Sequence, residues 1–202
     1  MAILALSNAA AGSVITPSEG SAEGTAGYTW HVTLDPMAND GTTLSGTVGT
    51  WSWEDSSLDL GDGIGWRHQS DWLAVTLTRS GVLEISATRA DEVTDARFFP
   101  SFSLYENHTD VTSQHAFENR ADLSWDDDLK LVAFVENSER SEASLSLALP
   151  AGEYTIVLGG NGKSEDLPEN VNYLLSLTTV PEPSTLCLGA LGALVLTARR
   201  RR

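Results

Sequence analysis

Short runs of alternating hydrophobic and polar residues fill the chain between residues 28 and 180. In the run WLAVTLT, Leu73, Val75 and Leu77 share one side, and Thr76 and Thr78 share the other. A period of two residues is typical of a half-buried β-strand. This run therefore predicts a strand with one face toward a core.

A second run, VLEISAT at residues 82–88, has the same period and places Leu83, Ile85 and Ala87 on one side. Only a short polar turn that contains Gly81 separates it from the first run. Two alternating runs joined by such a turn predict a β-hairpin.

Seven more segments alternate in the same way, and turn-forming Gly, Pro, Asn and Asp residues separate them. They are residues 28–34, 43–53, 99–106, 129–137, 144–150, 153–160 and 172–180. No segment of the body has apolar residues at helical spacing over ten or more residues. The sequence thus predicts an all-β fold, an antiparallel, jelly-roll-like β-sandwich of about nine strands.

The last 22 residues follow a different pattern. Residues 181–183 read Pro-Glu-Pro, and residues 184–198 are uncharged and rich in Leu, Ala, Gly and Val. As a helix, those fifteen residues span roughly 22 Å, against about 30 Å for a bilayer core, so they predict a short transmembrane helix. Proline blocks helix continuation, which predicts an extended, accessible Pro-Glu-Pro. Four arginines that would lie on the cytoplasmic side end the chain: Arg199, Arg200, Arg201 and Arg202.

These three parts, in this order, closely resemble the PEP-CTERM sorting signal. Pro181, Glu182 and Pro183 match its motif, and residues 184–198 and the arginines match its helix and basic end. The resemblance implies recognition by an exosortase, an integral membrane cysteine protease-transpeptidase that removes the tail. It also implies export by a Gram-negative bacterium that makes exopolysaccharide, with a transient anchor in the inner membrane.

The other end of the chain also favours export. Residues 1–11 contain a short apolar stretch followed by small residues, which we interpret as the remainder of a signal peptide. The predicted organisation is a residual signal peptide at residues 1–11, a β-sandwich domain at 12–180 and a sorting signal at 181–202.

The body resembles the bacterial pre-peptidase C-terminal type of domain between residues 71 and 179. The matching features are an Asp-Trp strand, its Gly-led successor, the strand PSFSLY, the turn LPAGEY and the closing strand NYLLSL. That family is non-catalytic and usually accompanies secreted enzymes. Residues 12–70 lie outside the resemblance, and residues 107–130 depart from its compact pattern.

Charge and cysteine content exclude several classes of function. The net charge is −16, and residues 1–180 carry 8 basic and 27 acidic residues, a net charge of −19. A body this acidic repels nucleic acid, because binding to the phosphates requires cationic side chains. The single cysteine, Cys187, lies in the tail, so the body has no disulfide, thiolate zinc site or cysteine nucleophile.

No motif for catalysis is present, so the sequence predicts no catalytic residue and no enzyme. None of the four histidines forms a zinc-binding pattern, and His108 and His115 are expected to be exposed in a loop. Calcium is the cofactor that best suits the acidic turns, although neither turn fits the known loop pattern. Those turns contain Asp59 and Asp62, and Asp126, Asp127 and Asp128.

Six tryptophans are the remaining candidate for binding. Trp51 and Trp53 share a face at two-residue spacing, where exposed indoles could stack on sugar rings. Core packing is the more common use of such side chains.

The sequence favours an exported, non-enzymatic protein that an exosortase sorts. Its expected place is the cell surface or the exopolysaccharide matrix of a biofilm. One alternative is a carbohydrate-binding module, with calcium as an assisting ion. A second alternative is a divergent secreted hydrolase.

Overall fold

The computed structural model places twelve strands and one 3₁₀ helix within the part of the chain that it describes. It describes residues 14–17, 28–50, 52–54, 65–66, 70–91, 98–108, 129–161 and 171–181.

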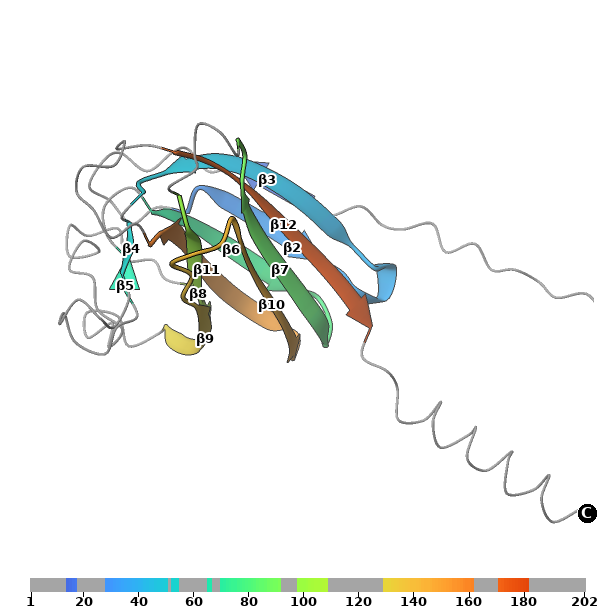
Figure 1. Ribbon diagram of the computed structural model, residues 1–202. Coiled ribbons are helices and arrows are strands. Elements are labelled where there is room, and N and C mark those ends of the chain that lie inside the picture. The colour runs from blue at the N-terminus through green and yellow to red at the C-terminus, as the bar shows by residue number, and fades with distance from the viewer. Residues whose placement is uncertain are drawn as a thin grey trace, which may run out of the picture.

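Two sheets pack face to face, and a two-stranded ribbon lies at one end (Figure 1). Sheet A has six strands, in the order β1 (Val14–Pro17), β2 (Trp30–Leu34), β6 (Asp71–Leu77), β11 (Gly152–Gly160), β8 (Pro100–Glu106) and β9 (Lys130–Val135). Sheet B has four, in the order β10 (Glu142–Leu149), β7 (Gly81–Arg89), β12 (Val171–Pro181) and β3 (Gly41–Val48). The ribbon consists of β4 (Trp53–Glu54) and β5 (Gly65–Trp66).

The all-β prediction is confirmed, and each of the nine predicted segments contains a strand. Three short strands, β1, β4 and β5, were not predicted as separate elements. One pair is not antiparallel as predicted, because β2 runs parallel to β6. After β2 the chain crosses to sheet B, where it forms β3. It later returns to sheet A as β6, in the same direction as β2.

The predicted hairpin between β6 and β7 is wrong. Strand β6 pairs with β2 and β11 in sheet A, whereas β7 pairs with β10 and β12 in sheet B. Residues 78–80 form an arch between the sheets. At its start, the Thr78 N–H donates to the Leu34 carbonyl oxygen at 3.0 Å, which extends the β2–β6 pairing by one residue.

The inward face of each sheet supplies the main core, as the period of two residues predicts. The core side chains of β6 and β7 are the predicted ones, and all are at most 2% exposed: Leu73, Val75, Leu77, Leu83, Ile85 and Ala87. Strand β12 adds Val171, Tyr173, Leu175 and Leu177. Burial of these apolar side chains from both sheets is the main favourable contribution to folding.

The outer face of sheet A is also covered over β6, β8 and β11, which the sequence did not predict. A second apolar cluster contains Trp72, Tyr105, Leu129 and Val157, with Tyr28 packed against it. Strands β8 and β11 are consequently buried along almost their whole length on both faces.

Two glycines in β11 let another segment lie directly on sheet A. A Cβ atom at Gly160 would lie 2.5 Å from the Thr50 carbonyl oxygen, and one at Gly159 would lie 2.5 Å from the Ser52 Oγ. The Gly160 N–H donates to the Ser52 Oγ at 3.1 Å. The close approach of backbone to backbone requires glycine at this place.

A buried polar contact joins the two sheets. The Tyr173 hydroxyl in β12 donates to the Asp71 Oδ2 in β6 at 2.5 Å, and the Thr29 hydroxyl donates to the Asp71 Oδ1 at 3.1 Å. Burial raises the pKa of the Asp71 carboxyl, and these two hydrogen bonds oppose the rise. Burial and the adjacent carboxylate also raise the pKa of Tyr173, so its hydroxyl keeps its proton and donates.

No helix among the described residues is long and apolar enough to cross a membrane. The predicted transmembrane helix at residues 184–198 and the predicted signal peptide at residues 1–11 lie outside the described residues.

We predict that Tyr173→Phe lowers the free energy of unfolding by about 2 kcal/mol at neutral pH, because it leaves a buried carboxylate with one hydrogen bond fewer. Tyr154→Phe is the control, since the Tyr154 hydroxyl donates to a neutral acceptor, the Pro150 carbonyl oxygen, at 2.9 Å. We expect it to cost about 1 kcal/mol or less in urea unfolding. Equal losses in the two variants would contradict a special role for the Asp71–Tyr173 contact.

The same contact predicts a pH effect. Since folding raises the pKa of Asp71, its contribution to stability is greatest below its unfolded-state pKa and is lost as pH rises through its folded-state pKa. Asp71→Asn removes this titration. Urea unfolding at about pH 7 and at about pH 4 measures the free energy of unfolding of wild type and of Asp71→Asn. We expect wild type to gain stability relative to the variant as the pH falls. A constant difference would argue against the raised pKa.

Candidate functional site

The end of β12 is the place where the body meets the C-terminal motif. Thr179 donates two hydrogen bonds to the Asp40 carbonyl oxygen, from its backbone N–H at 2.8 Å and from its Oγ1 hydroxyl at 3.0 Å. Its neighbours Val180 and Pro181 lie opposite Val82 and Gly81 of β7. We call Asp35, η1 (Pro36–Ala38), Asp40, Gly81 and residues 179–181 the tail root.

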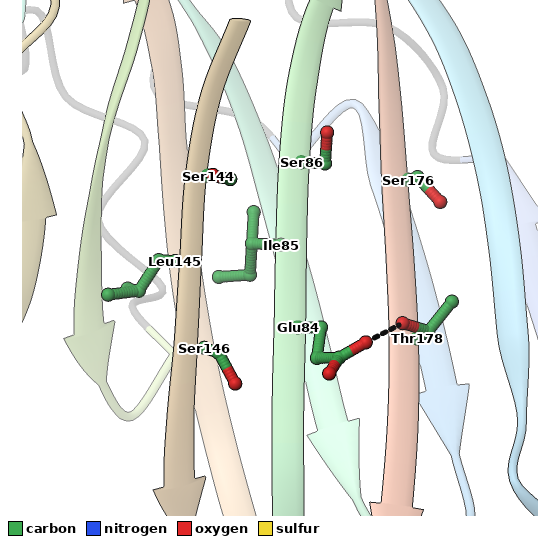
Figure 2. A pocket seen from close by; sticks show the side chains of 8 residues that line it. All are labelled: Glu84, Ile85, Ser86, Ser144, Leu145, Ser146, Ser176 and Thr178. Atoms are coloured by element: carbon green, nitrogen blue, oxygen red, sulfur yellow. Dashed lines mark hydrogen bonds between the residues drawn. The ribbon is translucent and has the colours of Figure 1, made fainter.

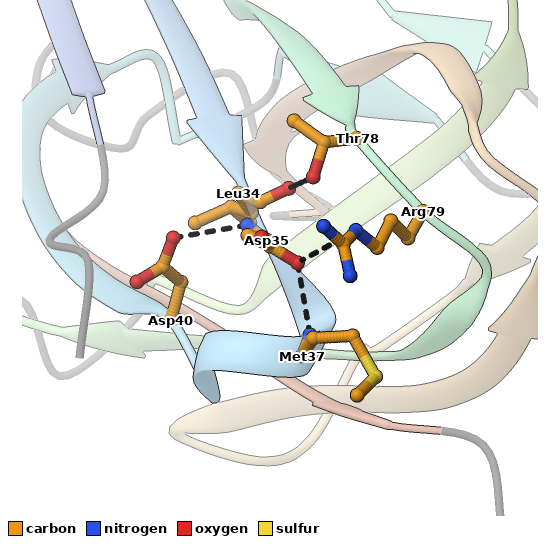
Figure 3. A network of polar contacts seen from close by, with 6 residues as sticks. All are labelled: Leu34, Asp35, Met37, Asp40, Thr78 and Arg79. Atoms are coloured by element: carbon orange, nitrogen blue, oxygen red, sulfur yellow. Dashed lines mark hydrogen bonds and ion pairs between the residues drawn. The ribbon is translucent and has the colours of Figure 1, made fainter. Parts of the chain in front are cut away.

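A network of hydrogen bonds fixes the Asp40 loop (Figure 3). The Asp35 N–H donates to the Asp40 Oδ2 at 2.9 Å, and the Met37 N–H donates to the Asp35 Oδ1 at 3.0 Å. Asp35 therefore acts as the N-cap of the 3₁₀ helix, as short polar side chains do. The Arg79 Nε lies 3.9 Å from the same Asp35 oxygen, so the β6–β7 arch also contacts the network.

Gly81 is packed so closely at this end that no side chain fits. A Cβ atom there would lie 2.4 Å from the Pro36 Cβ and 2.8 Å from the Val180 carbonyl oxygen. The 3₁₀ helix, the start of β7 and the end of β12 thus contact one another directly. In Figure 1, β12 ends on the side of the sandwich opposite the β4–β5 ribbon.

Pro181, the first residue of Pro-Glu-Pro, is extended as predicted but only partly accessible. Pro181 is the last residue of β12, where it pairs with Gly81 and is half-buried. The physical reason is that the strand period of β12 continues up to Pro181, and a proline is tolerated at the end of a strand. Glu182, Pro183 and the four arginines Arg199 to Arg202 lie outside the described residues.

A second candidate surface covers the outer side of sheet B. Serine and threonine residues project from all four strands in register, so that Ser144, Ser86, Ser176 and Thr43 form one row across the sheet. We call the nine outward residues of this kind the hydroxyl face: Thr43, Ser45, Thr47, Ser86, Thr88, Ser144, Ser146, Ser176 and Thr178. A pocket of about 290 Å³ lies over β10, β7 and β12, and Figure 2 shows the side chains that line it.

The hydroxyl face carries little charge for so acidic a protein. Only Glu84 and Glu142 among the outward residues of these four strands are charged. The Thr178 hydroxyl donates to the Glu84 Oε2 at 3.0 Å, and the Ser86 hydroxyl donates to the Glu142 Oε1 at 2.9 Å. The surface can therefore form many hydrogen bonds and has little electrostatic attraction for a cationic or anionic ligand.

Trp53 is packed in the interior, as the more common use of tryptophan predicts, and not exposed for sugar stacking. Its side chain is fully buried on sheet A, where its Nε1 donates to the Ser103 Oγ at 3.1 Å and its ring stacks on Phe134 at 6.3 Å. A buried ring is not accessible to a sugar. The outer face of sheet A is covered here, which local spacing cannot reveal. Trp51 lies outside the described residues.

Two histidines lie in an aromatic cluster that the sequence did not predict. The rings of His31 and His108 each lie 5.5 Å from the ring of Tyr28. His31 belongs to strand β2, within the strand predicted at residues 28–34. Thr155 donates to the Asn107 carbonyl oxygen at 2.7 Å, so the Tyr28 hydroxyl is the donor in its 2.7 Å contact with Thr155.

The described residues contain no group of three or more His, Cys, Asp or Glu that could hold a metal ion. The predicted acidic turns, with Asp59 and Asp62 and with residues 126–128, lie outside that part of the chain. Calcium therefore stays a prediction of the sequence.

Comparison with known families identifies the C-terminal segment. Residues 179–202 match the PEP-CTERM protein-sorting motif. This confirms the resemblance predicted from the sequence, and the match begins within β12, at Thr179. The motif implies an exported protein that an exosortase sorts, with a transient membrane anchor before display at the surface. No curated protein matches the chain significantly.

Three solved structures are similar to the chain at low identity. The copper-binding, surface-associated protein CorA of Methylomicrobium album BG8 has 12% identity and a TM-score of 0.46, over 68% of this chain and 93% of that one. The pre-peptidase C-terminal domain of Bacillus anthracis collagenase, of the type that the sequence predicts, has 12% identity and a TM-score of 0.39, over 72% and 91%. The copper-binding secreted protein MopE of Methylococcus capsulatus has 11% identity and a TM-score of 0.41, over 73% and 86%. Similarity at this level transfers no ligand and no activity.

We predict that Gly81→Ala lowers the free energy of unfolding by about 1 to 3 kcal/mol, because the new methyl group forces Pro36 and β12 apart. Gly152→Ala is the matched control, since a Cβ atom there would meet Tyr154 at 3.6 Å, an ordinary contact. Chemical unfolding of both variants measures the difference. Equal stability of the two variants would show that the tail root is not packed as described.

Proposed function

We propose that the protein is a non-enzymatic component of the cell surface or exopolysaccharide matrix, delivered there after an exosortase removes its tail. The observation that carries this proposal is the match to the sorting motif at residues 179–202, which begins in the last strand of the folded body. The body upstream of residue 181 is then the delivered cargo.

The position of β12 supports removal of the tail without damage to the body. This strand lies between β7 and β3 in sheet B, and its inward side chains belong to the main core. The core side chains of β12, the last of which is Leu177, thus precede the matched segment, and every described strand ends at or before Pro181. Loss of the tail leaves the sandwich complete.

The non-enzymatic part of the proposal rests on the sequence. The body has no cysteine and contains neither a Gly-x-Ser-x-Gly turn nor a phosphate-binding glycine loop. A structural or adhesive role needs a stable, soluble body instead. The net charge of −19 over residues 1–180 promotes solubility through self-repulsion.

The hydroxyl face favours one second candidate function, the binding of neutral polysaccharide. Its hydroxyl groups can donate and accept hydrogen bonds, as those of a sugar polymer do. The acidic body disfavours anionic polymers. The open groove over β10, β7 and β12 offers an extended rather than an enclosed site.

We predict that a triple change of Pro181, Glu182 and Pro183 to alanine stops tail removal in a Gram-negative host that contains an exosortase. Intact-mass spectrometry should find the wild type without its arginine end and the variant with it. The control changes Ser86, Ser144 and Ser146 to alanine and should be processed normally. A wild type that keeps its tail in this host, or a triple variant that loses it equally fast, would refute sorting through this motif.

For the second candidate, we predict that the full-length protein migrates more slowly in an affinity gel that contains the neutral glucan dextran. A gel that contains alginate should not slow it. Ser144→Glu with Ser176→Glu should reduce the retardation at least about tenfold, because charge and bulk block the groove. Ser80→Glu with Ala151→Glu adds the same charge at the end of the sandwich as a control. No retardation of wild type by dextran would remove this candidate.

A further inference from the structure

The sorting motif begins inside the folded body. Three residues of the matched segment, Thr179, Val180 and Pro181, belong to β12. Thr179 is 1% exposed, and its two hydrogen bonds to Asp40 tie it to the loop after the 3₁₀ helix. The first residue of Pro-Glu-Pro thus belongs to both the sheet and the motif.

Pairing in a sheet and binding to a processing enzyme compete for the same residues. An enzyme that recognises a peptide in extended form uses its backbone groups and alternate side chains. In β12, the residues up to Pro181 already lie opposite residues of β7. Such an enzyme can bind them only when the end of the strand opens.

The tail root determines how far this opening extends. Pro181 has no N–H group to contribute to the sheet, and it is the terminal residue of the strand, so its pairing is the weakest. Two residues earlier, the two hydrogen bonds from Thr179 to the Asp40 carbonyl oxygen oppose further opening. Local opening is easiest at strand ends with few buried contacts and becomes costly where contacts are buried. Opening should therefore release Pro181 and stop before Thr179.

We propose that the tail root controls tail removal, so that cleavage waits for Pro181 to leave the sheet and the cut lies on the C-terminal side of Pro181. This inference rests on the proposed sorting by an exosortase. In the reaction, the peptide bond after the last retained residue breaks, and its acyl group passes to water or to an amine acceptor. The acceptor's proton goes to the amino group of the released tail. The mature protein keeps all of β12.

The decisive variant inserts Gly-Ser-Gly-Ser-Gly between Val180 and Pro181 of the full chain, which moves Pro-Glu-Pro and the residues after it away from the sheet. In a Gram-negative host with an exosortase, pulse-chase and intact-mass analysis measure the rate of tail loss. We expect the insertion to speed tail loss at least about threefold, because the motif no longer waits for the strand to open. Wild type should yield a mature chain that ends at Pro181, Glu182 or Pro183.

A second pair of variants tests the same step without changing the motif or its distance from the body. Gly81→Ala loosens the tail root and should also speed tail loss, whereas Gly152→Ala should leave it unchanged. Rates that are equal in wild type, the insertion variant and Gly81→Ala would overturn the inference, as would a mature chain that ends at Val180 or earlier. Absence of tail loss from wild type would instead overturn the proposed sorting.

Discussion

The structure depends on the packing of β12 in the middle of sheet B. This strand pairs with β7 on one side and β3 on the other, and its inward side chains reach the core. A sandwich that needs its last strand in a central position cannot close until the C-terminal end of the body has been incorporated. The sorting motif begins within that strand, at Thr179, so completion of the fold and presentation of the motif take place at the same end of the molecule.

The two sheets differ in what they present to solvent. Part of the outer face of sheet A is covered by a second apolar cluster and by residues 49, 50, 52 and 53, whose backbone lies against Gly159 and Gly160. Sheet B has one buried face and one face of serine and threonine. Sheet A therefore supplies much of the buried apolar area, and sheet B supplies the regular exposed surface. This division leaves the hydroxyl face and the tail root on the same sheet, since β12 contributes to both.

Polar contacts at two places join distant parts of the sandwich. The Asp71–Tyr173 hydrogen bond joins the sheets, and the Asp40–Thr179 bonds hold the end of β12. Both contacts are directional, unlike apolar packing, and removal of either partner lowers the stability of the fold. They help to hold β12 in one register.

The sequence by itself determined the strands, their inward residues and the sorting motif, because each is a property of contiguous residues. The period of two residues identified Leu83, Ile85 and Ala87 as core, and the order of prolines, apolar residues and arginines identified the motif. The same period could not distinguish a hairpin from an arch between sheets, because both give β6 and β7 identical inward faces. The burial of Trp53, the rows of the hydroxyl face and the place of Pro181 in the sheet were decided only by tertiary structure. Each depends on contacts between segments far apart in the chain, such as Asp40 and Thr179, which are 139 residues apart.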